Sequence, residues 1–169
     1  MQELDNPDLQ HIATPMDFLG INYYPRSVAS AAGTWDARNS GLELTEMGWE
    51  IYPEGLTELL LRLHRDYPVP PLYVTENGCA DSGDSQRPFY LLEHVRAVGT
   101  ALGEGLDLRG YLHWSLTDNY EWGSFAPRFG LFQIDFHDDR RERMARDELG
   151  DNPSKTYADW VRRHGGRWH

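Results

Sequence analysis

Short apolar strand patterns and amphipathic helix patterns alternate along this 169-residue chain, and their order restricts the fold more than any other feature. The strand patterns are brief, apolar and bounded by residues that favour turns; they cover residues 17–24, 71–78 and 110–116. The helix patterns carry an apolar stripe and begin at a proline, which is favoured in the first helical turn; these prolines are Pro53, Pro88 and Pro153. The order strand, helix, strand, helix, strand, helix predicts parallel βαβ units in an α/β fold.

Three parallel strands are few for a complete domain of this kind. A closed (β/α)8 barrel needs eight strands and roughly 250 residues, and parallel sheets need cover on both faces. The chain is therefore expected to be either a small open α/β domain or a part of something larger. Residues 26–48 show no clear period and are expected to form one long loop.

The central strand pattern ends in a carboxylate. Leu72–Val74 is the apolar run, Glu76 closes it, and Asn77–Gly78 follows. Asn and Gly both tolerate positive φ, so a sharp turn is expected just past Glu76. Glu76 then lies at the carboxyl end of a strand, where catalytic groups gather in barrels of alternating strands and helices. For this motif alone, a glutamate that caps the next turn is the alternative.

Each of the three strand patterns delivers polar or aromatic side chains at its carboxyl end. These are Asn22–Tyr24, Glu76–Asn77, and Trp114 with Asp118–Trp122. Parallel neighbours place such groups on one rim, where indole faces suit the C–H surface of a sugar and carboxylates suit its hydroxyls. A tyrosine hydroxyl there can orient a nucleophile. Core packing of Trp114 and a surface loop at Glu121–Trp122 remain the alternatives.

Net charge restricts the partners that this chain can bind. It holds 16 Lys and Arg against 27 Asp and Glu, a formal charge of −11. Nucleic acid and anionic membranes are repelled by such a field, so neither is expected as a partner, whereas a neutral sugar is not penalised. The single cysteine, Cys79, fits a reducing compartment. With an acidic amino end and no apolar run of membrane-spanning length, the expected location is the cytoplasm.

The seven histidines show no ligand spacing such as His-x-x-x-His. Neither a metal nor another cofactor is therefore expected.

Several motifs together resemble the glycoside hydrolase family 1 β-glycosidases. Leu72–Gly78 resembles the nucleophile motif of the family, Asp17–Tyr24 its sixth barrel strand and Met47–Leu56 the lead into its sixth helix. Trp114–Trp122 resembles the eighth strand and sugar-binding loop, and Arg128–Leu131 the turn after it. The match spans about residues 14–164 and is nearest to archaeal-type enzymes. It implies the C-terminal part, about strands 6–8, of a (β/α)8 TIM barrel.

The resemblance implies roles for individual residues in a retaining hydrolysis, in which one carboxylate attacks the anomeric carbon and a second acts as acid and base. Glu76 is the implied nucleophile, and Tyr24 the hydroxyl that hydrogen-bonds it. Trp114 is implied to lie under the glycone sugar, and Trp49 to border the aglycone. The residues expected to bind the β-glycoside substrate are Asn22, Trp49, Trp114, Glu121, Trp122 and Phe129.

The sequence departs from the family pattern in three respects. The acid/base motif Thr-x-Asn-Glu-Pro is absent, as are the N-terminal Gln, His and Asn that grip the glycone, and Gly123–Pro127 is one residue shorter than the family's loop. Residues 1–169 are therefore expected to be the C-terminal segment of a single catalytic domain whose N-terminal part is absent. The expected partner is a complementary N-terminal barrel segment, without which the chain is expected to be inactive or nearly so.

Other functions compete with this interpretation. A non-catalytic carbohydrate-binding or scaffold half-barrel is the main alternative, although a binder has no need of an oriented nucleophile. A phospho-glycosidase is disfavoured because the Glu121 carboxylate repels a phosphorylated sugar. The preferred sugar, the aglycone and homo-oligomer formation are left open by the sequence.

Overall fold

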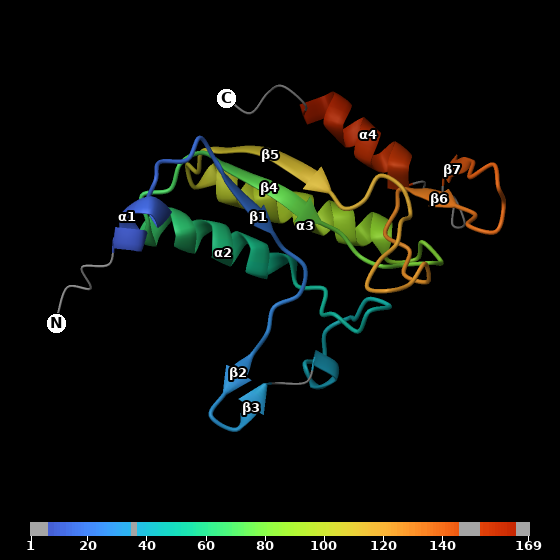
Figure 1. Cartoon of the computed structure of the whole chain (residues 1–169), viewed down its shortest axis with the longest axis horizontal. Coiled ribbons are helices and arrows are strands. Elements are labelled where there is room, and N and C mark those ends of the chain that lie inside the picture. The colour runs from blue at the N-terminus through green and yellow to red at the C-terminus, as the bar shows by residue number, and fades with distance from the viewer. Residues whose placement is uncertain (1–6, 35–36, 146–152, 165–169) are drawn as a thin grey trace.

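The computed structural model describes residues 7–34, 37–145 and 153–164. A parallel three-stranded sheet with the strand order β1-β4-β5 lies at its centre (Figure 1). These strands are Leu19–Asn22, Leu72–Asn77 and Leu108–His113. The helices that follow them are α2 (Pro53–Asp66), α3 (Arg87–Gly103) and α4 (Pro153–His164). The predicted order of parallel βαβ units is confirmed.

Shorter elements complete the described part of the chain. They are α1 (Pro7–Ile12), the hairpin of β2 (Ala29–Ser30) and β3 (Gly33–Thr34), a 3-10 helix (Ala37–Asn39), and the antiparallel pair β6 (Phe132–Ile134) and β7 (Arg143–Ala145). The prediction of one long loop over residues 26–48 was wrong in part, because a short hairpin at residues 29–34 and a 3-10 helix at residues 37–39 interrupt it. No helix among the described residues has the length and apolar character needed to cross a membrane.

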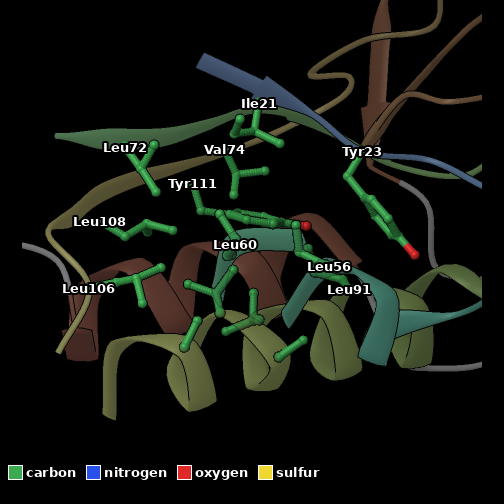
Figure 2. Packing of buried hydrophobic residues seen from close by; sticks show 14 residues of the cluster. Ile21, Tyr23, Leu56, Leu60, Leu72, Val74, Leu91, Leu106, Leu108 and Tyr111 are labelled. Atoms are coloured by element: carbon green, nitrogen blue, oxygen red, sulfur yellow. The ribbon is translucent and has the colours of Figure 1, made fainter. Parts of the chain in front are cut away.

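One face of the sheet forms the hydrophobic core against the helices. Leu72 and Val74 of β4 are fully buried there against Leu56 and Leu60 of α2, and Leu91 of α3 joins the same cluster. Figure 2 shows these side chains filling the space between the sheet and the helices. Complete burial of one such side chain stabilises the fold by about 1.5–3 kcal/mol. The apolar stripes seen in the sequence are thus the contact faces of α2 and α3.

The opposite face of the sheet is polar and aromatic and is more exposed. Phe18 and Leu112 are each 51% exposed there, and Phe18 packs edge-on against Tyr73 with ring centroids 5.2 Å apart. On the same face Thr75 donates a hydrogen bond of 2.7 Å to the side-chain oxygen of Asn22. The two faces of the sheet therefore differ, and the helices α2 and α3 cover the buried one.

The structure corrects the interpretation of Asn77 and Gly78 as turn residues. The strand β4 continues through Asn77, and neither residue has a positive φ. Asn77 is fully buried, and its amide nitrogen donates to the carbonyl oxygen of Tyr23 at 2.7 Å and to the hydroxyl of Tyr90 at 2.9 Å. Its amide oxygen accepts from the Tyr111 hydroxyl at 2.7 Å. Asn77 is a buried link between neighbouring elements because all of its hydrogen-bonding groups find partners in the core.

Gly78 is required for a close approach between two backbone segments. A Cβ atom at this position would lie 1.8 Å from the carbonyl oxygen of Trp114, which follows β5. Any side chain here forces the ends of β4 and β5 apart.

We expect Gly78→Ala to lower the free energy of unfolding by about 1–3 kcal/mol or more, because the methyl group has no space. Gly99→Ala is the matched control, since Gly99 lies in α3 and a Cβ atom there would meet nothing within 4 Å. That change should stabilise the helix by about 0.5–1 kcal/mol. Urea unfolding followed by circular dichroism measures both, and equal effects of the two substitutions would contradict this account.

Candidate active site

The carboxyl ends of the three parallel strands share one cavity of about 110 Å³. The residues that line it come from the carboxyl end of β4, from the segments after β1 and β5, and from the segment before α2: Tyr24, Trp49, Glu76, Trp114, Glu121, Trp122 and Phe129. Seven of the eight site residues expected from the sequence therefore meet in one place. The eighth, Asn22, lies on the same side of the sheet but does not line the cavity; it is exposed and bonded to Thr75.

Glu76 and Tyr24 are placed by the pairing of β1 with β4. Asn22 is paired in register with Glu76, and the backbone N–H of Tyr23 donates to the carbonyl oxygen of Glu76 at 2.9 Å. The Tyr24 hydroxyl, one residue further on, donates to Oε2 of the Glu76 carboxylate at 3.0 Å. Among the described residues this is the hydrogen bond that orients the carboxylate, and it leaves the other oxygen available to a ligand.

The Tyr24 phenol remains protonated over the whole physiological range. Burial, the hydrogen bond to Glu76 and the negative charges of Glu76 and Glu121 raise its pKa well above the ordinary value for tyrosine. Tyr24 is therefore a permanent hydrogen-bond donor to Glu76 and does not act as a base.

Aromatic rings form the walls of the cavity. The Trp49 ring lies edge-on to Tyr24 at 5.6 Å and to Trp122 at 6.1 Å between centroids, and it is tilted against Phe129 at 6.2 Å. The indole nitrogen of Trp114 donates to Oε1 of Glu121 at 2.7 Å. This hydrogen bond connects the loop that carries Glu121 to the end of β5, so the Trp114 indole and the Glu121 carboxylate lie side by side in the cavity wall.

Trp49 reaches the cavity from a tight antiparallel turn. Leu44 pairs with Glu50 across this turn, the backbone N–H of Thr45 donates to the carbonyl oxygen of Trp49 at 2.8 Å, and Gly48 has a φ of +72°. The side chain of Gln86 donates to the carbonyl oxygen of Leu44 at 3.0 Å, which docks the turn on the loop after β4. The position of Trp49 is thus fixed by hydrogen bonds to the backbone.

A buried arginine joins the loop after the Glu76 strand to the loop that carries Phe129. Arg87 is fully buried and forms an ion pair of 2.6 Å with Asp84. Its terminal nitrogens donate to the carbonyl oxygens of Cys79 at 2.9 Å, Phe129 at 3.0 Å and Arg128 at 2.9 Å, and also to that of Asp81. A planar guanidinium with five donors can serve two loops at once.

Asp118 anchors the loop after β5 through hydrogen bonds to backbone groups of that loop. Its carboxylate is buried and accepts hydrogen bonds from the backbone N–H of Gly130 at 3.0 Å and of Ile134 at 3.3 Å. It also pairs with Arg128 at 3.2 Å. The segment between Asp118 and Gly130 therefore starts and ends at one fixed point, and Glu121, Trp122 and Phe129 lie within it.

The sequence patterns did not single out the residues that hold the site together. In the sequence Arg87 directly precedes the proline that opens a helix, and Asp118 is one of the polar residues expected at the rim; no pattern marks either of them as a buried anchor. The cysteine beside this network is not a nucleophile candidate, because burial raises the pKa of the Cys79 thiol to about 12.

His113 ends β5 beside Trp114, and its ring nitrogens are buried. Burial and, second, the charge of Arg87 lower the pKa of this imidazole from 6.5 to about 3. The unfolded chain takes up a proton as the pH falls below 6.5, whereas the folded chain does so only near pH 3. The stability that depends on neutral His113 is therefore complete above pH 6.5 and is lost as the pH falls from 6.5 toward 3.

We expect His113→Gln to flatten the pH dependence of the unfolding free energy by up to about 1.4 kcal/mol per pH unit in that window. Carboxylates contribute to the slope in parent and variant alike, so the difference isolates the imidazole. His64→Gln, at an exposed position on α2, is the matched control and should keep the parent slope. Urea unfolding at a series of pH values measures the slopes, and parallel curves for all three proteins would refute the assignment.

Comparison with known proteins matches this chain to one protein family. The family model described as "Glycosyl hydrolase family 1" matches residues 1–164. A β-galactosidase of Sulfolobus acidocaldarius is 48% identical over 136 residues, which cover 72% of this chain and 28% of the relative. A bifunctional β-D-glucosidase/β-D-fucosidase of Bifidobacterium breve is 37% identical over 187 residues, 92% of this chain and 38% of the relative.

Solved structures show the same relationship. A β-glucosidase from Exiguobacterium marinum superposes with a TM-score of 0.80 at 36% identity, covering 96% of this chain and 39% of that one. A hyperthermophilic β-glucosidase mutant, described as forming a dodecameric structure in the crystal form, gives a TM-score of 0.75 at 43% identity over 83% of this chain and 34% of that one. These neighbours have the TIM barrel fold. The chain therefore spans roughly a quarter to two fifths of the length of these relatives.

Proposed function

The chain belongs to glycosyl hydrolase family 1, and from this premise we propose that it carries the nucleophile part of a retaining β-glycosidase site. On this proposal residues 1–169 are a C-terminal segment, about strands 6–8, of a single (β/α)8 catalytic domain. The observation that supports it best is the Glu76 carboxylate, bonded to the Tyr24 hydroxyl at 3.0 Å inside a cavity walled by three tryptophans.

The proposed reaction proceeds in two displacements. A Glu76 oxygen forms a bond to the anomeric carbon while the bond from that carbon to the leaving-group oxygen breaks, which gives a covalent glycosyl-enzyme. Water then attacks the anomeric carbon, and Glu76 departs as a carboxylate. A second carboxyl group, about 5–5.5 Å from the first, protonates the leaving group and later activates the water. We assign that group to a complementary N-terminal barrel segment, because the Thr-x-Asn-Glu-Pro motif does not occur in residues 1–169.

The other cavity residues fit the binding of an unphosphorylated sugar. Trp114 offers an indole face to the glycone, and its bond to Glu121 at 2.7 Å holds that carboxylate ready for sugar hydroxyls. The Glu121 charge disfavours a phosphorylated sugar. We also propose roles in substrate binding for Asn22, Trp122 and Phe129. The net charge of −11 and the single buried cysteine are compatible with a cytoplasmic enzyme acting on neutral β-glycosides.

Covalent trapping tests the nucleophile directly. We expect a 2-fluoro-β-glucoside with an activated leaving group to add one sugar mass to the chain, located on Glu76 by peptide mass spectrometry. Glu76→Gln should give no adduct. Saturable sugar binding without any adduct would instead support a non-catalytic carbohydrate-binding half-barrel.

Tyr24→Phe tests the orienting hydroxyl. A hydrogen bond to a charged group contributes about 1.5–3 kcal/mol, so its loss should slow trapping roughly 10- to 100-fold. Tyr67→Phe is the matched control, because Tyr67 is 57% exposed at the end of α2 and should leave the trapping rate unchanged. An unaltered rate in Tyr24→Phe would remove Tyr24 from the proposed mechanism.

Residues 1–169 by themselves should hydrolyse alkyl β-glycosides very slowly, because general acid catalysis typically contributes about 10²–10⁴-fold. Addition of a complementary N-terminal segment should restore turnover of these substrates and of aryl β-glucosides. Efficient hydrolysis of an alkyl glycoside by residues 1–169 alone is the outcome that contradicts a divided site.

A further inference from the structure

A hollow of about 380 Å³ lies beside β6 and shares no lining residue with the candidate active site. Its lining comes from the two segments that flank β6: Ser124, Phe125, Ala126, Arg128, Phe136, His137 and Arg141. This lining contains two arginines and a histidine but no aspartate or glutamate. The chain as a whole carries a formal charge of −11 and repels anions, so the hollow is a local exception to its field.

The two arginines are held against the same aromatic ring. The guanidinium carbon of Arg128 lies 5.1 Å from the centroid of the Phe136 ring, and that of Arg141 lies 5.7 Å from it. One terminal nitrogen of each side chain is also fixed by a backbone carbonyl. Arg128 donates to the oxygen of Ile134 at 3.0 Å, and Arg141 donates to that of Phe136. The fold therefore places both charges, which lowers the entropic cost of gathering them around a ligand.

Both guanidiniums keep donors for a ligand. Arg128 pairs with Asp118 through Nη1 at 3.2 Å, whereas Arg141 has no carboxylate partner within 4 Å among the described residues. In the described part of the chain, Nε and Nη2 of both arginines make no hydrogen bond. The Ser124 hydroxyl oxygen accepts from the backbone N–H of Ala126 at 2.9 Å, so its proton can be donated to a ligand.

Three carboxylates of the neighbouring chain are bonded to other groups. Asp138 accepts a hydrogen bond from the backbone N–H of Arg140 at 2.9 Å and pairs with its guanidinium at 3.2 Å. Glu142 pairs with the same guanidinium at 3.5 Å. Asp135 accepts from the backbone N–H of His137 at 2.8 Å. These ion pairs form with Arg140, which lies outside the lining of the hollow.

The donors of the hollow match a tetrahedral oxyanion. A phosphate group presents at least three oxygens, and guanidiniums bind it through paired N–H groups. A carboxylate has two oxygens and uses fewer of these donors. The Phe125 and Phe136 rings, with centroids 4.3 Å apart, form an apolar wall, and Phe125 is 47% exposed. An organic group attached to the phosphate can therefore pack against Phe125.

We propose that this hollow is a binding site for a phosphate group, free or carried by a small molecule. Arg128 and Arg141 are the guanidinium donors to the phosphate oxygens, and Phe125 is the contact for an attached organic group.

The phosphate site is separate from the sugar cavity and does not depend on the role of Glu76. The Glu121 charge disfavours a phosphate in the sugar cavity, whereas the lining of the hollow carries no carboxylate. Ser124 connects the two places, because its backbone exchanges hydrogen bonds of 2.8 and 3.0 Å with that of Glu121. A ligand in the hollow therefore contacts the loop that presents Glu121.

Phosphorus NMR titration of the 169-residue chain with inorganic phosphate and with phenyl phosphate tests the site. The ionic strength is held constant, because salt screens such contacts. We expect saturable binding with a Kd of about millimolar or tighter for at least one probe. Acetate, added as a competitor, should bind more weakly than phosphate. Absence of saturable binding of both phosphate probes, or an equal affinity for acetate, overturns the proposal.

The two probes also distinguish the sources of the phosphate. Tighter binding of phenyl phosphate that is lost in Phe125→Ala supports the site and assigns it to a phosphorylated organic molecule. Binding of phenyl phosphate that is no tighter than that of inorganic phosphate supports the site and assigns it to the free ion.

Arg141→Gln should raise the Kd of inorganic phosphate at least about ten-fold, because charge-assisted hydrogen bonds are lost. Arg140→Gln is the matched control, since it removes the same charge from the adjacent residue, which does not line the hollow. It should change the Kd by less than about two-fold. Equal effects of the two substitutions overturn the assignment.

A second pair of variants tests the charge of the hollow at a lining residue that is exposed. Ala126→Asp and Ala126→Asn introduce side chains of the same shape, and only the first is charged. The Kd of inorganic phosphate should be at least about ten-fold higher in Ala126→Asp than in Ala126→Asn. Equal Kd values in this pair contradict the site. None of these titrations uses a glycoside, so their failure leaves the proposed nucleophile role of Glu76 intact, and a failure of covalent trapping leaves the phosphate site intact.

Discussion

The carboxamide of Asn77 is the interaction on which the arrangement of the site depends. It bonds to the backbone of the β1 end through the Tyr23 carbonyl, to α3 through the Tyr90 hydroxyl and to β5 through the Tyr111 hydroxyl. Glu76 immediately precedes it, so the nucleophile candidate is attached to a residue whose side chain bonds to three neighbouring elements. Because the amide is fully buried, the loss of any one partner would leave one of its N–H groups or its oxygen without that hydrogen bond in the core.

Two buried charges extend this constraint to the loops. Arg87 bonds to carbonyl oxygens on both sides of the site, and Asp118 to backbone N–H groups of the segment that carries Phe129. Removing one member of such a buried pair typically costs about 3–5 kcal/mol, because the remaining charge is left without a partner. The walls of the cavity are therefore formed by loops whose backbone is hydrogen-bonded to buried charged side chains.

The buried face of the sheet contributes to the stability of the fold, whereas the carboxyl ends of the strands carry the residues of the cavity. The apolar face packs on α2 and α3 and supplies the hydrophobic core. The ends of the same strands carry Tyr24, Glu76 and Trp114 into the cavity, and the opposite face exposes Phe18 and Leu112. Arg26 and Val28 lie outside the core and line a hollow together with Trp49.

The sequence alone determined the alternation of strands and helices, the buried stripes and the meeting of Tyr24, Glu76 and Trp114 at one rim. These features follow from periodicity and chain order, which are local properties of the chain. Only the tertiary structure decided that Asn77 is a buried hydrogen-bonding residue and not a turn residue. It also decided that the Trp114 carbonyl oxygen leaves no space for a side chain at position 78, and that Asn22 lies beside the cavity without lining it. The partners of Arg87 and of Arg141 were decided there as well. The reason is physical: a hydrogen bond between distant segments depends on which carbonyl groups the folded backbone leaves unpaired, and no local pattern records that.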